Sequence, residues 1–331
     1  MVKVCILGAG AIGGHIAGHL ARGRQCQLSV VARGDTLAAI RRDGLRVTTP
    51  NADFNVHPTA TDDPATLGPQ DFLLLTVKAH QLAAALPLIA SLIDVDTAIL
   101  PPTTGLPAAF LHGLTGPLGG RALMPVDPDG AQARAMPASQ VLGIVYWIGA
   151  HSEGPGIVRQ DGARATCMVG ELDGSLSARA TTLATLLSDS GIPTPVRPAI
   201  RSDIWIKFVN SLCWNPVAVL TGATNGAIGD DAQAIATVRR MIDEADAVAA
   251  RLGIAMPVAP EKRIAVTLSA RAHKMSMLQD LEHERPLEID ALARSIEAVK
   301  QLANVATPTI DAVLSLITLR SATRPHKEMM T

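Results

Sequence analysis

A glycine-rich turn close to the start of the chain constrains the fold more than any other feature. The stretch Lys3-Val-Cys-Ile-Leu-Gly8-Ala-Gly10-Ala-Ile-Gly13-Gly14 joins an apolar run to closely spaced glycines. Val4 to Leu7 do not alternate with polar residues, which is typical of a parallel strand covered on both faces. Because the amphipathic run Ile12 to Leu20 follows, the pattern predicts a buried strand, a tight turn and a helix.

The glycines are spaced as in a dinucleotide-binding turn. Gly8 permits the tight turn, Gly10 lets the backbone approach a pyrophosphate, and Gly13 lets the helix pack closely on the strand. The start of the helix, at Ala11 and Ile12, then offers unpaired N–H groups and a positive dipole end to the phosphates. The sequence predicts a bound dinucleotide, with a plain strand–turn–helix corner as the alternative.

Length, charge and cysteine content narrow the class of protein. A chain of 331 residues favours two domains. Its net charge of -1 provides no broad basic field, and no run of about 18 apolar residues occurs, so neither nucleic acid nor a membrane is expected as a partner. The cysteines are scattered without zinc-binding spacing, which indicates reduced thiols in a cytoplasmic protein: Cys5, Cys26, Cys167 and Cys213.

Two histidines on the expected first helix, His15 and His19, are spaced i, i+4, a spacing that metal ligands can use. No further ligand stands near them in the sequence. No metal site is therefore expected.

The end of the second expected strand, Leu28 to Ala32, indicates which dinucleotide binds. In dinucleotide-binding folds, the residue about 20 positions beyond the glycine turn recognises the ribose of the cofactor. An acidic residue there binds the 2′-hydroxyl of NAD, and an arginine binds the 2′-phosphate of NADP. Arg33 stands there, and a guanidinium suits a phosphate dianion. The pattern favours NADP(H). A solvated Arg33, or Asp35 as the ribose acid of an NAD enzyme, are the alternatives.

Two later strand ends add candidates. Phe72 to Val77 predict a strand, and Lys78 follows at the end where open α/β sheets bind ligands. Lys78 is a candidate second positive charge for the cofactor, or else a surface lysine at a helix start. Ala98 to Leu100 predict another strand, and the proline-rich loop after it, which contains Thr104, is expected beside the nicotinamide.

The remainder of the chain changes from strands to helices. Val141 to Ile148 and Ile157-Val158 predict a hairpin-like pair, Thr166 to Val169 a further strand, and the proline-rich segment 191–198 a linker. Helical patterns cover Gln81–Ile93, Ser177–Leu187, Asp203–Leu220, Asp231–Leu252, Glu261–Ala272 and Pro286–Ala303, with a last helix after Thr307. The expected class is α/β, with an N-terminal Rossmann-type doubly wound parallel sheet over residues 1–196 that binds NADP(H). An all-α C-terminal domain over residues 197–331 is expected to hold the substrate and the catalytic groups.

The helix expected after the linker carries the residue pattern that best fits a catalytic site. Lys207, Ser211 and Asn215 are spaced i, i+4, i+8, so they follow one helix face, whereas Asn210 lies off that line. A polar stripe among large apolar residues makes a plausible catalytic face, and Pro216 removes a backbone hydrogen bond beside it. A polar stripe that faces solvent is the alternative.

A second polar cluster surrounds Ser276 and Glu288. Ser276 is a candidate contact for a substrate carboxylate, and Glu288 for a hydroxyl or for orienting Lys207. Without other evidence the cluster is also typical of a helix start with an acidic first turn.

Taken together, the motifs resemble one enzyme family over nearly the whole chain. They are Gly8-Ala-Gly10-Ala-Ile-Gly13-Gly14, Val31-Ala-Arg33-Gly34, Thr76-Val77-Lys78-Ala79, Val126-Asp127-Pro128, Pro155-Gly156, Lys207 with Asn215-Pro216, and Ser276-Met-Leu-Gln-Asp280 through Glu288-Ile-Asp290. The chain resembles the 2-dehydropantoate 2-reductase family, also called ketopantoate reductases. The resemblance implies NADPH-dependent reduction of the 2-oxo group of 2-dehydropantoate to pantoate, a step in pantothenate biosynthesis.

The resemblance also implies roles for individual residues. It assigns Lys207 as the general acid, Glu288 as a substrate-orienting carboxylate that also lies at the cofactor, and Asn215 and Ser276 as substrate contacts. The implied cofactor contacts are Gly8, Gly10, Ala11, Ile12, Gly13, Arg33 and Lys78. The expected partner is a small 2-oxo acid, and a homodimer is a possible assembly.

Two positions depart from the family pattern. Thr104 and Ser211 stand where the family usually has asparagine, so each replaces an amide with a shorter hydroxyl. A site built to hydrogen-bond one substrate discriminates strongly when its partners change. A related NADP-dependent reductase of another 2-oxo acid or carbonyl compound is therefore the first alternative, and a non-catalytic NADP-binding regulatory protein the second.

Overall fold

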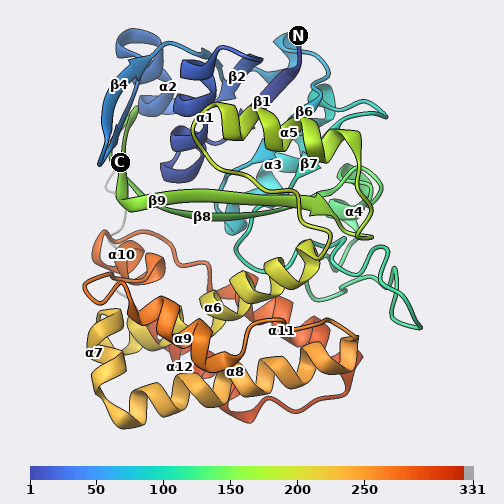
Figure 1. The fold of residues 1–331 in the computed structure, drawn as a ribbon, viewed down its shortest axis with the longest axis vertical. Coiled ribbons are helices and arrows are strands. Elements are labelled where there is room, and N and C mark those ends of the chain that lie inside the picture. The colour runs from blue at the N-terminus through green and yellow to red at the C-terminus, as the bar shows by residue number, and fades with distance from the viewer. Residues whose placement is uncertain (324–331) are drawn as a thin grey trace. The chain divides into compact units, whose positions relative to one another are not determined.

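The computed structural model describes residues 1–323, which form two compact units. The strand unit comprises residues 1–103 and 107–204, and the helical unit comprises residues 104–106 together with the chain from residue 205 onward. Figure 1 shows strands in the first of these and helices in the second. The expected α/β class, a Rossmann-type parallel sheet followed by an all-α part, is confirmed. The functional division at residues 196 and 197 stays a prediction.

The first sheet of the strand unit is parallel and has the order β5-β2-β1-β6-β7. Its strands are β1 (Lys3–Leu7), β2 (Gln27–Val31), β5 (Thr59–Thr61), β6 (Phe72–Leu75) and β7 (Ala98–Leu100). Val4 of β1 lies between Leu28 of β2 and Phe72 of β6, and all three are buried. The apolar run in β1 is thus explained by burial at the centre of the sheet.

Helices connect these strands. After β1 comes α1 (Ala11–Gly23), and α2 (Gly34–Asp43) follows β2. The prediction of one continuous helix over residues 81–93 is wrong. The segment consists of the 3₁₀ turn η2 (Ala79–Gln81), α3 (Leu82–Ile89) with Pro87 inside it, and the 3₁₀ turn η3 (Ala90–Leu92). A proline cannot supply its backbone N–H, which shortens regular helix here. Another 3₁₀ turn, η1 (Pro64–Thr66), precedes β6.

A second sheet, with the order β4-β3-β9-β8, was not expected. Its strands are β3 (Leu45–Thr49), β4 (Ala52–Val56), β8 (Leu142–Gly154) and β9 (Ile157–Glu171). The expected hairpin is present, but Thr166–Val169 is part of β9 rather than a separate strand. The register shifts between Ile148 and Ala150 and again before Gly154, so the alternation of side chains is broken and conceals the length of both strands.

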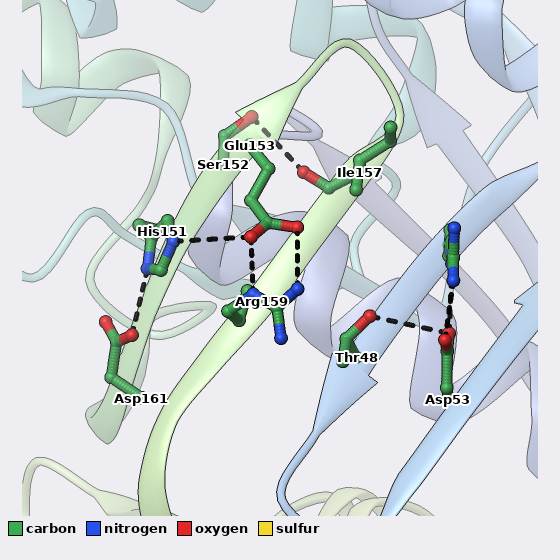
Figure 2. A network of polar contacts seen from close by, with 9 residues as sticks. Thr48, Asp53, His151, Ser152, Glu153, Ile157, Arg159 and Asp161 are labelled. Carbon is green, nitrogen blue, oxygen red and sulfur yellow. Dashed lines mark hydrogen bonds and ion pairs between the residues drawn. The ribbon is translucent and has the colours of Figure 1, made fainter.

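Polar and charged side chains pair across neighbouring strands of this second sheet, as Figure 2 shows for Glu153 with Arg159 and for His151 with Asp161. On β3 and β4, Arg46 pairs with Asp53 at 2.6 Å. Exposed ion pairs of this kind contribute about 0 to 1 kcal/mol each. Because these side chains face solvent, each pair adds little to the stability of the fold.

The proline-rich segment 191–198 runs along β9. The N–H groups of Cys167 and Val169 donate to the carbonyls of Pro193 and Pro195 at 3.1 and 3.2 Å, and the N–H of Arg197 donates to the carbonyl of Val169 at 2.7 Å. Helix α5 (Ala178–Asp189) precedes it, and α4 (Ala131–Ala135) lies between β7 and β8. The segment is thus a linker in composition but is held by backbone hydrogen bonds.

The helical unit contains most of α6 (Ile200–Thr221) and the helices α7 (Asn225–Asp230), α8 (Ala232–Leu252), α9 (Pro260–Leu268), α10 (Ser276–Glu282), α11 (Ile289–Ala303) and α12 (Pro308–Ala322). The five expected helices of this part are present, with α9 shorter than expected, while the short α7 and α10 were not expected. Trp205, Phe208 and Trp214 of α6 are among the largest fully buried side chains of the protein. Among the described residues, no helix has the length and apolar character to cross a membrane.

Candidate active site

The glycine turn after β1 has the geometry that its spacing predicts. Gly8 has a φ of +105°, a conformation that side-chain-bearing residues rarely adopt. A Cβ on Gly13 would lie 1.9 Å from the carbonyl oxygen of Gly8 and 2.3 Å from Oγ1 of Thr76, so only glycine allows this packing. A Cβ on Gly10 would meet nothing within 4 Å. Gly10 thus borders open space, whereas Gly13 closes the turn against the sheet.

The start of α1 is suited to an anion. Its first intrahelical hydrogen bond runs from the N–H of Gly14 to the carbonyl of Gly10 at 2.7 Å, so the N–H groups of Ala11, Ile12 and Gly13 precede the helical ladder. No acidic residue occupies the first turn, and no side chain caps it. Open backbone at Gly10 and uncapped N–H groups together fit the pyrophosphate of a dinucleotide.

Two cationic residues follow the strands on either side of β1. Arg33 is exposed, caps the start of α2 just after β2, and its side chain has no hydrogen bond or ion pair with the residues described. Lys78 follows β6, and its N–H donates to Oε1 of Gln81 at 3.1 Å. The strands β2, β1 and β6 are parallel neighbours. Arg33, Lys78 and the glycine turn therefore all lie at the carboxyl ends of the strands.

In the helical unit, α6 presents Lys207, Ser211 and Asn215 at the expected i, i+4, i+8 spacing. Lys207 keeps some exposed surface, yet desolvation of its ammonium lowers its pKa from 10.5 to about 8. Asn210 points elsewhere, because its side-chain oxygen accepts a hydrogen bond from the Thr267 hydroxyl of α9 at 2.9 Å. A lysine with this pKa is a competent proton donor near neutral pH.

Asn215 and Ser276 meet in the structure. The Asn215 side-chain oxygen accepts hydrogen bonds from the N–H of Met277 at 2.9 Å and from the Ser276 hydroxyl at 3.4 Å. Its amide nitrogen donates to the carbonyl of Ser211 at 3.2 Å. Asn215 is buried, whereas Ser276 is exposed at the start of α10. The side chain expected to contact substrate therefore also joins α6 to α10.

Thr104 and Glu288 are both associated with α11. Glu288 is 7% exposed and occupies the N-cap position, directly before the first residue of this helix. Thr104 belongs to the short segment 104–106 of the helical unit, in which the N–H of Leu106 donates to Oγ of Ser295 at 2.8 Å. Sequence reasoning missed Ser295, since a lone serine inside an amphipathic helix gives no signal of a partner 189 positions away.

Fold and site together define a class of protein. A parallel sheet with a dinucleotide-type glycine turn, accompanied by a helical unit that carries a desolvated lysine, is typical of nicotinamide-dependent oxidoreductases. Two family models match the chain: Ketopantoate reductase PanE/ApbA over residues 4–174, and Ketopantoate reductase PanE/ApbA C terminal over residues 199–321. The chain belongs to the ketopantoate reductase family and is an oxidoreductase.

Individual relatives agree with this assignment. A 2-dehydropantoate 2-reductase of Mesorhizobium japonicum is 40% identical over 317 residues, which cover 96% of this chain and 97% of that protein. A solved structure from Ralstonia solanacearum MolK2, provisionally named a ketopantoate reductase, has a TM-score of 0.90 at 38% identity and covers 98% of this chain and 99% of its own. D-mandelate dehydrogenase, solved with NADH and anilino(oxo)acetate, shares the fold with a TM-score of 0.80 at 23% identity, covering 97% and 98% of the two chains.

Proposed function

We propose that this protein reduces the 2-oxo group of 2-dehydropantoate to pantoate with NADPH, as a cytoplasmic step of pantothenate biosynthesis. The observation that carries the proposal is the desolvated Lys207 in a chain that is 40% identical, over nearly its full length, to a 2-dehydropantoate 2-reductase. The family membership supports the reaction class. The choice of substrate and cofactor rests on individual residues of the two units.

The residues proposed to hold the cofactor lie at one edge of the parallel sheet. The N–H groups of Ala11, Ile12 and Gly13 bind the pyrophosphate beside Gly10, where no side chain intervenes. Arg33 binds the 2′-phosphate, because a guanidinium pairs well with a phosphate dianion, and Lys78 adds a second positive charge. When bound, NADPH supplies the hydride.

Lys207 is the proposed general acid. As the 2-oxo oxygen of the substrate gains negative charge, the ammonium stabilises that charge and then donates a proton to it. Desolvation supports both tasks, since it strengthens the electrostatic interaction and lowers the pKa of Lys207 to about 8. Glu288 orients the substrate, and Ser276 and Asn215 contact its polar groups.

A second candidate function is reduction of a different 2-oxo acid. The observation that favours it is the pair of hydroxyl side chains, Thr104 and Ser211, at positions where the family pattern has asparagine. A hydroxyl offers one donor and reaches less far than an amide, so the preferred substrate would differ in size or in its hydrogen-bonding groups.

The deciding experiment measures NADPH oxidation at a fixed enzyme concentration against 2-dehydropantoate and a panel of branched and aromatic 2-oxo acids. Lys207→Ala is the blank. The proposal requires the highest kcat/KM for 2-dehydropantoate. A higher value for another 2-oxo acid would establish the second candidate, and NADPH binding without turnover of any of them would indicate a non-catalytic binding protein.

A further inference from the structure

The segment Thr104–Leu106 packs in a different unit from the residues that flank it in the sequence. Residues 98–103 and 107–110 belong to the strand unit, but residues 104–106 belong to the helical unit. Gly105 and Leu106 are buried there. Three residues of a loop without regular secondary structure stay in place only through specific contacts, so the contacts that hold this segment matter.

The contact is made by Ser295 of α11, which is 1% exposed. Its hydroxyl accepts the N–H of Leu106 at 2.8 Å and donates to the carbonyl of Ala291 at 2.6 Å. Donation to the carbonyl one turn earlier is common for a serine in a helix. Acceptance of a backbone N–H from a distant segment is a separate feature, and it satisfies a buried donor that would otherwise be costly.

Gly105 allows this close approach. Its φ is +83°, and a Cβ added to it would lie 2.8 Å from both the Ala291 carbonyl oxygen and Oγ of Ser295. The backbone at Gly105 therefore rests directly on the first turn of α11. A larger residue at position 105 or 295 would separate the two.

This placement concerns the proposed substrate site, because α11 begins at its cap, Glu288, only three residues before Ala291. Thr104 is the direct neighbour of Gly105. We infer that Ser295 is a positioning residue that fixes Thr104 beside the Glu288 end of α11 and thereby sets the affinity for the 2-oxo acid. This inference rests on the proposed function and extends it to a residue that does not itself contact the substrate.

The test uses Ser295→Ala, with Ser315→Ala as the matched control. Ser315 of α12 also donates to the carbonyl one turn earlier, at 2.8 Å from Asp311, but it is exposed and binds no distant segment within residues 1–323. Ser295→Ala should raise the KM for the 2-oxo acid about 3- to 10-fold, the effect of one hydrogen bond, with kcat changed less than twofold. The affinity for NADPH should stay unchanged, and Ser315→Ala should match the wild type in every constant.

Two further readouts separate positioning from general stability. Hydrogen exchange of the peptide that contains Leu106 should accelerate in Ser295→Ala and stay unchanged in Ser315→Ala. In a double-mutant cycle, Thr104→Ala should have little further effect on KM in the Ser295→Ala background, because Ser295 acts through Thr104. Gly105→Ala should reproduce the KM and exchange changes, since it breaks the same contact.

Unchanged exchange of the Leu106 peptide, an unchanged KM, or fully additive effects of Thr104→Ala and Ser295→Ala would overturn the inference. If the wild-type enzyme turned over none of the 2-oxo acids, the proposed function and the substrate role of Ser295 would both fall. The exchange measurement would then still decide whether Ser295 anchors the segment.

Discussion

The side-chain oxygen of Asn215 accepts a hydrogen bond from the backbone N–H of Met277 at 2.9 Å. Met277 lies in the first turn of α10, whose own cap residue, Met275, provides no side-chain hydrogen bond. Asn215 of α6 thus supplies from another helix the acceptor that a serine or aspartate cap supplies locally. Because Ser276 lies in the same turn, the capping interaction also determines where its hydroxyl points.

Two substitutions distinguish capping by Asn215 from direct substrate contact. Asn215→Ala removes the acceptor, so we expect it to lower the free energy of unfolding by about 1 to 2 kcal/mol, the usual effect of losing a helix cap, and to raise KM. Asn215→Asp keeps an acceptor at the helix start but replaces the amide donor with a negative charge. Urea unfolding and steady-state kinetics would check both. Near-normal stability with a large loss of 2-oxo acid affinity in Asn215→Asp would indicate contact with the substrate carboxylate, whereas near-normal kinetics would indicate capping alone.

Lys207→Ala should lower kcat about 100- to 10,000-fold, the range typical for removal of a general acid, while NADPH affinity persists. Stopped-flow turnover and fluorescence titration of NADPH measure the two quantities. Lys262→Ala, at an exposed position on α9, is the matched control. A parallel loss of cofactor binding and activity in Lys207→Ala would contradict the assigned role.

The pKa of Lys207 also predicts the pH dependence of the reaction. Burial lowers this pKa to about 8, and only the protonated ammonium can donate. The kcat/KM for reduction should therefore be constant below pH 8 and fall as the pH rises through it, since deprotonation removes the acid. A profile that stays flat to pH 10 would show that no group with this pKa acts in the free enzyme.

The glycine turn could be predicted in detail and the second sheet could not, for a physical reason. The roles of Gly8, Gly10 and Gly13 follow from their spacing within one strand–turn–helix, which the sequence displays directly, although Gly8 and Gly13 also pack closely against Val77 and Thr76. The second sheet depends on the pairing of β3 with β9, at Arg46 with Ile157, across more than a hundred residues. Neither strand carries a local signal of that partner.

The same reasoning applies to the site. The stripe of Lys207, Ser211 and Asn215 follows from helical periodicity, which a sequence displays directly. The connection of Asn215 to Met277, and that of Leu106 to Ser295, are tertiary contacts between segments that only the fold brings together. Candidate residues could therefore be named from the sequence, but the residues that hold them in place could not.

Arg33→Ala should weaken NADPH binding about 10- to 100-fold, the range for losing a hydrogen bond to a charged group, and change NADH binding less than twofold. Arg42→Ala is the control, because Arg42 is exposed at the other end of the same helix and pairs only with its neighbour Asp43 in the described chain. Titration of protein fluorescence with each cofactor gives both affinities. Equal weakening for NADPH and NADH would mean that Arg33 does not read the 2′-phosphate.

The buried His15 and the partly buried His19 of α1 should make the strand unit sensitive to acid. His15 is fully buried against Gln160 at 2.9 Å, and its ring lies 4.5 Å from that of His19. Burial lowers the pKa of His15 from 6.5 to about 4 and also lowers the pKa of His19. Between pH 6.5 and pH 4 the unfolded chain binds more protons than the folded one. The stability that these histidines contribute is therefore complete above pH 6.5 and is lost as the pH falls toward 4.

We therefore expect the free energy of unfolding, measured with urea from pH 7 to pH 4, to contain a His15 contribution of up to about 1.4 kcal/mol per pH unit. His15→Gln removes the titrating ring, so the slope should decrease by up to that amount. A slope unaffected by His15→Gln would mean that His15 is already protonated in the folded protein over this range, contrary to its burial beside a second imidazole.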